Sequence, residues 1–223
     1  MSSSVDTRVQ RGSEAISNAD LGVGMRISVH PHSDDFVDVI LGALDQVKPL
    51  VEEYQLTVDT DDVSTYVGAE GENPEQRLAQ FATSLIAAAE RRSENGHIVA
   101  HLLFSRGCPG SAGCDLKTAV LPATKPVVLE STGVSTAAHW SLYPLLDADS
   151  PHGDHLPHVE AAIERASKRG VDVSARNFAT RLAGDLSDVI ATIVDSWSGL
   201  GEEIPHVVTH ASLSVNSPSE VDA

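Results

Sequence analysis

The amino-acid sequence predicts an α+β fold built from two tandem repeats, and three observations carry this prediction. Short blocks of sequence recur in the same order in both halves of the chain. Each half alternates extended and helical patterns in the same order. The composition, 223 residues that are 41% hydrophobic and 21% charged, is that of a globular chain with enough apolar material for one large or two small cores.

The duplication is carried by three pairs of matching blocks. RISVHP at 26–31 matches HWSLYP at 139–144, and STYVGAE at 64–70 matches ATRLAGD at 179–185. The longest pair is HIVAHLLFSRGCP at 97–109 with HVVTHASLSVNSP at 206–218. The spacing between the copies changes by only a few residues from pair to pair, as loop insertions produce, so we interpret the chain as a tandem duplication.

The first copy has the pattern strand, helix, two strands, helix, strand. Alternation at 26–32 predicts a strand, and Ser33 is the expected N-cap of the helix that follows, with Asp34 and Asp35 in its first turn. Extended runs at 55–60 and 63–71 precede a second helix that Asn73 and Pro74 open, and the strand at 97–105 closes the copy. The expected buried stripes of the two helices are Phe36, Ile40, Leu44 and Val47, and Leu78, Phe81, Leu85 and Ala89.

The second copy repeats this order. A strand at 137–144, a helix over 156–170, strands at 171–175 and 177–184, a helix with Leu186, Val189, Ile193 and Trp197 inside, and a strand at 206–215 are expected. With right-handed crossovers, βαββαβ closes as an antiparallel sheet with both helices on one face, the ferredoxin-like arrangement. We expect the repeats to pack against each other, or against a second subunit, through their uncovered sheet faces.

The domain boundaries follow from these patterns. We expect the polar segments 1–20 and 219–223 to be disordered tails, 21–110 and 135–218 to be the two repeats, and 111–134 to be a linker loop.

Charge restricts the classes of partner. A formal net charge of −17 disfavours nucleic acids and anionic membranes, and leaves a cationic or neutral small molecule as the expected partner. The N-terminal stretch lacks a signal-peptide core and no apolar run could span a bilayer, so a cytoplasmic protein without membrane insertion is expected. Cys108 and Cys114 are then expected to be free thiols rather than a disulfide.

Several spaced motifs together resemble a known family. GMRISVHPHSDDFVDVI, DTDDVSTYV, HIVAHLLFSRGCPG, HWSLYP and LSVNSPS, which extend from about residue 24 to 218, resemble the YkoF-like family of thiamine- and hydroxymethylpyrimidine-binding proteins. The resemblance implies two ACT-like, ferredoxin-fold repeats and homodimers. It also implies binding of thiamine or its pyrimidine precursor without catalysis, alongside a transport system for the precursor.

Such a ligand suggests which side chains to consider as contacts. An aminopyrimidine offers donors and acceptors, and thiamine adds a cationic thiazolium, so carboxylates, hydroxyls and aromatic rings suit it. The candidates in the first repeat are Ser28, His30, Asp34, Asp35, Thr65 and Ser105. Those in the second repeat are Ser141, Tyr143, Thr180, Ser214 and Asn216.

The copies differ at some of these positions. His30 is replaced by Tyr143, Gly107 by Asn216, and the paired aspartates by an insertion that carries Asp147 and Asp149. The sequence therefore predicts two pockets of unequal affinity.

Other interpretations stay open. A helix start alone explains Asp34 and Asp35, and common ancestry explains the shared hydroxyls. The ten histidines do not form a recognisable metal-ligand set, and no catalytic motif is present, so neither a metal site nor an enzyme is expected. The rival functions are an ACT-type small-molecule sensor and a small enzyme that uses a histidine–carboxylate pair such as His30 and Asp35.

Overall fold

The computed structural model describes residues 16–107, 120–145, 154 and 156–219. The helices are α1 (Asn18–Leu21), α2 (Phe36–Glu53), α3 (Pro74–Arg92), α4 (Leu156–Ala166) and α5 (Leu186–Leu200). The strands are β1 (Gly24–Pro31), β2 (Thr57–Thr60), β3 (Thr65–Gly68), β4 (Ile98–Arg106), β5 (Ser135–Pro144), β6 (Asp172–Arg176), β7 (Ala179–Asp185) and β8 (Val207–Val215). Cys108, Cys114, Asp147 and Asp149 lie outside the described residues.

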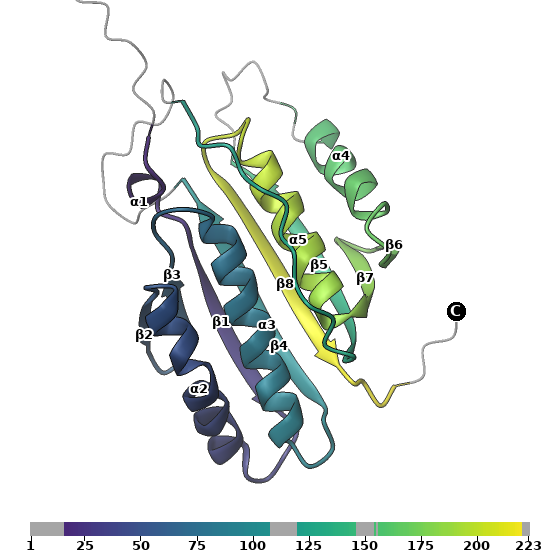
Figure 1. Ribbon diagram of the computed structural model, residues 1–223. Helices are drawn as coiled ribbons and strands as arrows, with labels where there is room; N and C mark the ends of the chain where they lie inside the picture. Colours follow the sequence, from purple (N-terminus) through teal and green to yellow (C-terminus); the bar gives the residue numbers. More distant parts are fainter. Residues whose placement is uncertain (1–15, 108–119, 146–153, 155, 220–223) are drawn as a thin grey trace, which may run out of the picture.

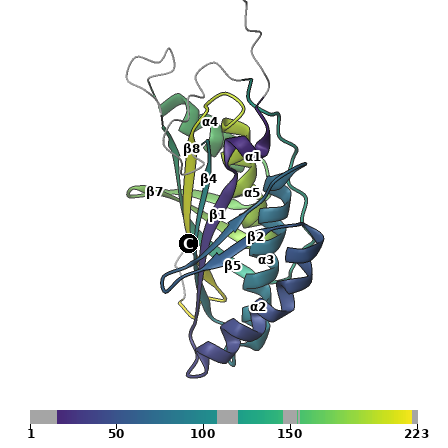
Figure 2. The same cartoon turned by 90° about the vertical axis from the view of Figure 1, so that its left-hand side faces the viewer.

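The predicted repeats are confirmed by the order of the elements. β1-α2-β2-β3-α3-β4 and β5-α4-β6-β7-α5-β8 each follow the βαββαβ pattern, and every pairing between neighbouring strands is antiparallel. The long helices all cover the same face of the sheet, which leaves the other face open (Figures 1 and 2). We call this uncovered surface the open face.

The two repeats join edge to edge, so the expectation that they might pack on each other through their sheet faces is wrong. β4 and β8 pair over their full length, from Ile98 opposite Val215 to Arg106 opposite Val207. The result is one eight-stranded sheet in the order β2-β3-β1-β4-β8-β5-β7-β6. A single sheet with helices on one side satisfies the backbone of both inner edges and keeps one continuous core.

The helices α3 and α5 bury the stripes that the sequence predicts. Leu78, Phe81, Leu85 and Ala89 are buried in α3, and Leu186, Val189, Ile193 and Trp197 in α5. Pro74 occupies the first turn of α3, where a missing N–H costs nothing. Partial burial opposes ionisation of Asp185, but hydrogen bonds from Ser187 and Thr132 outweigh it and lower its pKa, so a carboxylate caps α5. No helix within the described ranges is both long and apolar enough to cross a membrane.

Helix α2 differs from the prediction at its start and on its inner face. Asp35, not Ser33, is the N-cap residue, and its side chain makes no capping bond because it accepts a hydrogen bond from the Ser33 hydroxyl instead. Val39, Ala43 and Val47 are the buried residues of the helix, whereas Phe36 is half exposed and Ile40 and Leu44 are partly buried. The predicted stripe is therefore rotated toward an adjoining cavity.

A buried ion pair lies where the two repeats and the linker meet. Arg106, at the end of β4, is fully buried, and its Nη1 donates to Glu75 Oε1 of α3 and to the Ser198 carbonyl of α5, each at 3.2 Å. Arg106 also donates to the Pro122 carbonyl of the linker. Burial raises the pKa of Glu75, and Arg106 offsets part of that effect. One side chain thus ties together three parts of the chain.

Removing the carboxylate of this ion pair should destabilise the fold. We expect Glu75→Ala to lower the free energy of unfolding by about 3–5 kcal/mol, because the Arg106 charge would stay buried without its partner. Glu164→Ala, which removes an exposed i,i+4 pair with Lys168, should lower it much less, because solvent screens that pair. Urea unfolding of both variants measures the difference, and equal losses would contradict the role of the buried pair.

Candidate functional site

A cavity of about 420 Å³ opens in the first repeat between the sheet and helix α2. β1 pairs with β3 only as far as Ile27 opposite Thr65, so the end of β1 from Ser28 onward has no neighbour on that side. The β2–β3 turn and α2 enclose the gap that this leaves. The volume falls within the range of small-molecule sites in proteins.

The walls of the cavity are mainly apolar. Ile27 and Val29 of β1 form one side, and α2 and α3 contribute the other. The helix residues that line it are Phe36, Ile40, Ala43, Leu44, Leu85 and Ala89. Phe36, Ile40 and Leu44 face this space, which explains why none of them is fully buried. A flat aromatic ring would bury apolar surface on both sides here.

The polar part of the cavity comes from the β2–β3 turn. Thr60, Asp61, Asp62, Ser64 and Thr65 line it, and the hydroxyls of Thr60 and Thr65 lie 3.0 Å apart. A hydroxyl pair of this kind can both donate to and accept from a heterocyclic nitrogen or an amine. Asp62 adds an exposed carboxylate at the opening.

Asp61 fixes the conformation of this turn. Its Oδ1 accepts hydrogen bonds at 2.9 Å from the backbone N–H groups of Val63 and Ser64, and its Oδ2 accepts one at 2.8 Å from Arg26. The N–H groups of Ser64 and Val63, followed by Arg26, lower the pKa of Asp61 to about 2. Asp61 is therefore ionised at neutral pH and serves mainly to hold the turn closed.

The structure separates the candidate residues of the first repeat. Ser28, His30 and Thr65 line the cavity, and His30 Nε2 lies 3.0 Å from the Ser28 hydroxyl. Asp34 and Asp35 lie in the exposed turn before α2 and are not among the lining residues. Ser105 lies instead beside a groove on the open face.

The candidates of the second repeat are spread over both faces of the sheet. Thr180 is buried on the helix side, whereas Tyr143 is exposed and Ser141 donates to the Phe178 carbonyl on the open face. Ser214 lies 3.4 Å from His97 Nε2, and Asn216 donates to Glu90 of α3. None of the three cavities described in this section is lined by these residues.

The β2–β3 and β6–β7 turns are at equivalent positions in the two repeats but differ in the charge of their side chains. Thr60 pairs with Thr65 in the first repeat and Ala175 with Thr180 in the second, with four residues between the members of each pair. The first turn reads Asp-Asp-Val-Ser and the second Arg-Asn-Phe-Ala. The carboxylates of the first turn are thus replaced by a cation and an amide.

Sequence reasoning missed Thr60, Asp61, Asp62 and the lining role of Phe36. The segment DTDDVSTYV resembled the family as a whole, but only Thr65 in it was identified as a candidate. The available signal was a run of acidic residues at a hairpin turn, where carboxylates commonly cap backbone N–H groups.

Two further cavities lie outside this site. One, of about 460 Å³, is a groove on the open face lined by Gly24, Gly68, Tyr66 and Leu103, among others. The other, of about 440 Å³, lies between the linker, α4 and α5, and carries Lys125, Arg165, Lys168 and Arg169. In the second cavity Arg169 pairs with Asp195, and Glu202 accepts two hydrogen bonds from Thr124.

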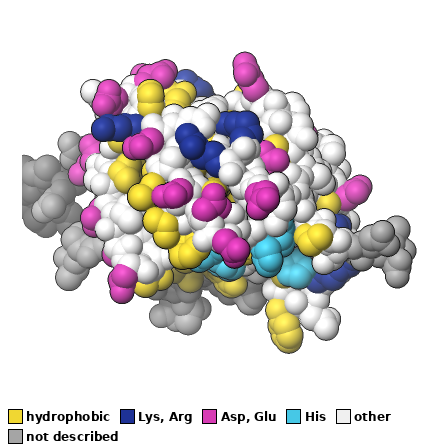
Figure 3. Space-filling view, turned by 90° about the horizontal axis from the view of Figure 1, so that it is seen from below, with side chains coloured by type: hydrophobic (Ala, Val, Ile, Leu, Met, Phe, Trp, Pro, Cys, Tyr) yellow, Lys and Arg dark blue, Asp and Glu magenta, His cyan; other side chains and the backbone are white. Residues whose placement is uncertain are grey.

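Histidines gather on the open face. His101 of β4 lies between His30 and His210, with ring centroids 5.6 and 6.3 Å away, and the rings of His32 and His97 are 5.6 Å apart. Figure 3 shows histidine side chains together at the lower side of the view, with acidic side chains spread above them. Among the described residues, no group of three or more His, Cys, Asp or Glu is arranged to hold a metal ion.

The lowered pKa of Asp61 predicts that the contribution of this residue to folding stability depends on pH. A carboxyl whose folded pKa is lowered stabilises the fold above its unfolded value, near 3.8, and loses that contribution as the pH falls toward about 2. We therefore expect Asp61→Asn to be less stable than the wild type at pH 7, and the difference to shrink at pH 3. Urea unfolding at both pH values measures it. Asp45→Asn on α2 is the control, and a wild-type–Asp61→Asn difference that is the same at both pH values would contradict the interpretation.

Comparison with known proteins places the chain among relatives. Residues 135–220 match the model of the family described as "YKOF-related Family". The chain is also similar to a protein of Bacillus subtilis (strain 168) named "Putative HMP/thiamine-binding protein YkoF", with 28% identity over 199 residues, which cover 88% of this chain and 91% of that protein. Both matches agree with the resemblance that the sequence motifs indicate.

Proposed function

We propose that this protein binds thiamine or its hydroxymethylpyrimidine precursor, without catalysis, in the cavity beside β1 and α2. The observation that carries the proposal is the combination of apolar walls with a hydroxyl and carboxylate rim in one cavity of suitable size. The name of the Bacillus subtilis relative supports the same ligand class. The ring-binding walls and the polar rim come from different elements, and the sheet holds both in place.

The chemistry of the ligand matches the rim. A pyrimidine ring would lie between the β1 and α2 walls, with its exocyclic amine and ring nitrogens near the hydroxyls of Thr60 and Thr65. The thiazolium of thiamine is cationic, and Asp62 at the opening would offset that charge. His30 and Ser28 complete the polar contacts on the open-face side of β1.

We assign unequal affinity to the two repeats. The second repeat keeps the buried threonine, Thr180, but has Arg176 and Asn177 where the first has Asp61 and Asp62. A cationic ligand would be repelled by the first substitution and would lose a counter-charge through the second. A site in the second repeat would therefore bind thiamine more weakly than the first.

The wider role is also part of the proposal. We expect a cytoplasmic homodimer that acts alongside a system for vitamin B1 precursor uptake or salvage, as the resemblance implies. Static light scattering of the purified chain tests the dimer, since the expected mass is twice 23.5 kDa.

Thr65→Val tests the hydroxyl contact. We expect the dissociation constant for hydroxymethylpyrimidine to rise about 5–10-fold, because a hydrogen bond that contributes about 1 kcal/mol would be lost. Thr180→Val is the matched control, a buried threonine at the equivalent position, and it should leave the tighter phase unchanged. Isothermal titration measures both. An absence of heat with thiamine and with the pyrimidine would remove the ligand assignment.

Asp62→Asn distinguishes the two ligands. We expect it to weaken thiamine binding about fivefold, since a nearby unit charge contributes about 1 kcal/mol in water, and to change pyrimidine binding much less. Asp45→Asn, an exposed position on α2 outside the cavity, should affect neither ligand. Equal losses for both ligands would show that Asp62 acts on the structure of the turn rather than on the cation.

A further inference from the structure

The cavity between the linker, α4 and α5, which we call the linker cavity, gathers positive charge in a strongly acidic chain. The chain has 15 lysine and arginine residues against 32 aspartate and glutamate residues. Four of the basic residues line this one cavity: Lys125 on the linker, and Arg165, Lys168 and Arg169 at the end of α4 and in the turn after it. The volume of about 440 Å³ is within the range of small-molecule sites in proteins.

Hydrogen bonds hold the linker wall of this cavity in place. The Val127 N–H donates to Asp195 of α5 at 2.7 Å, and the Val127 carbonyl accepts from Arg169 at 3.0 Å. Val128 exchanges two hydrogen bonds with Gln76 of α3, at 2.8 and 2.9 Å. Figure 1 shows the linker crossing over α5. The linker wall is therefore a fixed part of the fold.

Both carboxylates that line the linker cavity already have partners. Asp195 forms an ion pair with Arg169. Glu202 accepts hydrogen bonds from the N–H and the hydroxyl of Thr124, at 2.6 and 2.8 Å. These bonds, the N–H first, and the charge of Arg106 lower the pKa of Glu202, although partial burial opposes them. Neither carboxylate is paired with Lys125.

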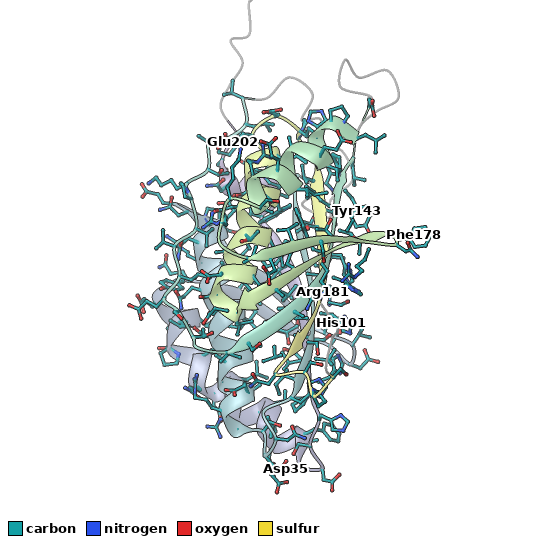
Figure 4. All side chains as sticks on the ribbon, turned by 90° about the vertical axis from the view of Figure 1, so that its right-hand side faces the viewer. Asp35, His101, Tyr143, Phe178, Arg181 and Glu202 are labelled. Atoms are coloured by element: carbon teal, nitrogen blue, oxygen red, sulfur yellow. The ribbon has the colours of Figure 1, made fainter. Side chains whose placement is uncertain are left out.

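Figure 4 shows that the linker cavity is separate from the open face. Glu202 lies on the helix side of the sheet, whereas Tyr143, Arg181 and His101 lie on the other side.

Lys125 and Arg165 lack a carboxylate partner in the part of the chain that the structure describes. Both side chains are exposed, and neither forms a hydrogen bond or an ion pair with another described residue. The dipole of α4 favours cations at its end, but it does not account for Lys125, which the linker contributes. Ser196 of α5 is buried beside the same space, and its hydroxyl has no hydrogen-bond partner among the described residues. Like charges that line one cavity repel each other, so a bound anion would stabilise this arrangement.

We propose that the linker cavity binds a small molecule through a phosphate group, which Lys125 contacts from the linker and Arg165 and Lys168 contact from the end of α4, with the Ser196 hydroxyl as a further donor. No residue that lines this cavity also lines the one beside α2, so the inference does not depend on the proposed thiamine site.

The donor set suits a phosphate better than a carboxylate. A phosphate ester carries nearly two negative charges at neutral pH and three acceptor oxygens, so it can be contacted from the linker and from α4 at once. Arginine donates to such a group with two parallel N–H bonds, and lysine adds a compact charge. The net charge of −17 repels anions at long range, so the local cations are what would retain the ligand.

Titration with inorganic pyrophosphate tests the site. We expect saturable heat in isothermal titration of the full-length chain, at constant ionic strength and without divalent cations. Inorganic phosphate should bind more weakly because it carries fewer charges. Lys125→Gln combined with Arg165→Gln should raise the pyrophosphate dissociation constant about tenfold or more, since two nearby charges are lost.

Lys48→Gln combined with Arg91→Gln is the matched control, because both residues are exposed, lie outside the cavity and give the same change in net charge. This control should bind pyrophosphate as the wild type does, and thermal unfolding checks that every variant folds. An absence of saturable heat, or an equal loss of affinity in the control, would overturn the site. Succinate that binds as tightly as pyrophosphate would overturn the assignment to a phosphate group.

Gly199→Leu tests the cavity without changing any charge. A Cβ atom on Gly199 would meet no other atom within 4 Å, so a larger side chain there would occupy open space beside the cavity. Leucine favours a helix more than glycine does, so the variant should still fold. We expect it to lose most of its pyrophosphate binding in the same titration. Binding that survives this change undiminished would mean that the anion lies elsewhere.

Discussion

The pairing of β4 with β8 is the interaction on which the rest of the structure depends. Each repeat alone is a four-stranded sheet with an unpaired inner edge, and nine residue pairs in register join β4 to β8. The backbone groups that point out from these two edges therefore find their partners in the other repeat. Arg106, at the end of β4, reinforces the junction through Glu75 and the Ser198 carbonyl. The joined sheet places all helices on one side, so the chain has one core and one uncovered face. The open face follows from this junction, whereas the cavity beside α2 is built within the first repeat.

The two repeats contain equivalent hairpins, β2–β3 and β6–β7, whose turns have different surroundings. In the first repeat, Asp61 and Arg26 fold the turn against the cavity, where its hydroxyls and Asp62 form the rim. In the second, the equivalent turn carries Arg176 and Phe178 and projects from the open face. The same backbone position thus lines a cavity in one copy and is exposed in the other.

The sequence predicted the repeated βαββαβ order, the start of α3 and the buried stripes of α3 and α5, because these depend on local periodicity and on Pro74. It did not predict that the repeats join by their edges, since β4 and β8 would have the same alternating pattern whether their edges were paired or exposed. The stripe of α2 was displaced because Phe36 and Ile40 line a cavity, and apolar periodicity does not distinguish a cavity wall from a core. Of the candidate site residues, Ser28, His30 and Thr65 came together at the cavity. Asp34 and Asp35 do not line it. The acidic residues at the cavity are Asp61 and Asp62, which belong to the β2–β3 hairpin.

The edge-to-edge junction also affects the solubility of the chain. Two separate four-stranded sheets would present four free edges, each able to pair with another molecule, whereas the joined sheet has two. The remaining edges, β2 and β6, are short strands of four and five residues, and their open-face positions carry Asp59, Asp172 and Arg176. Short, charged edges resist the addition of further strands. The fusion of the two repeats therefore limits open-ended polymerisation through sheet edges.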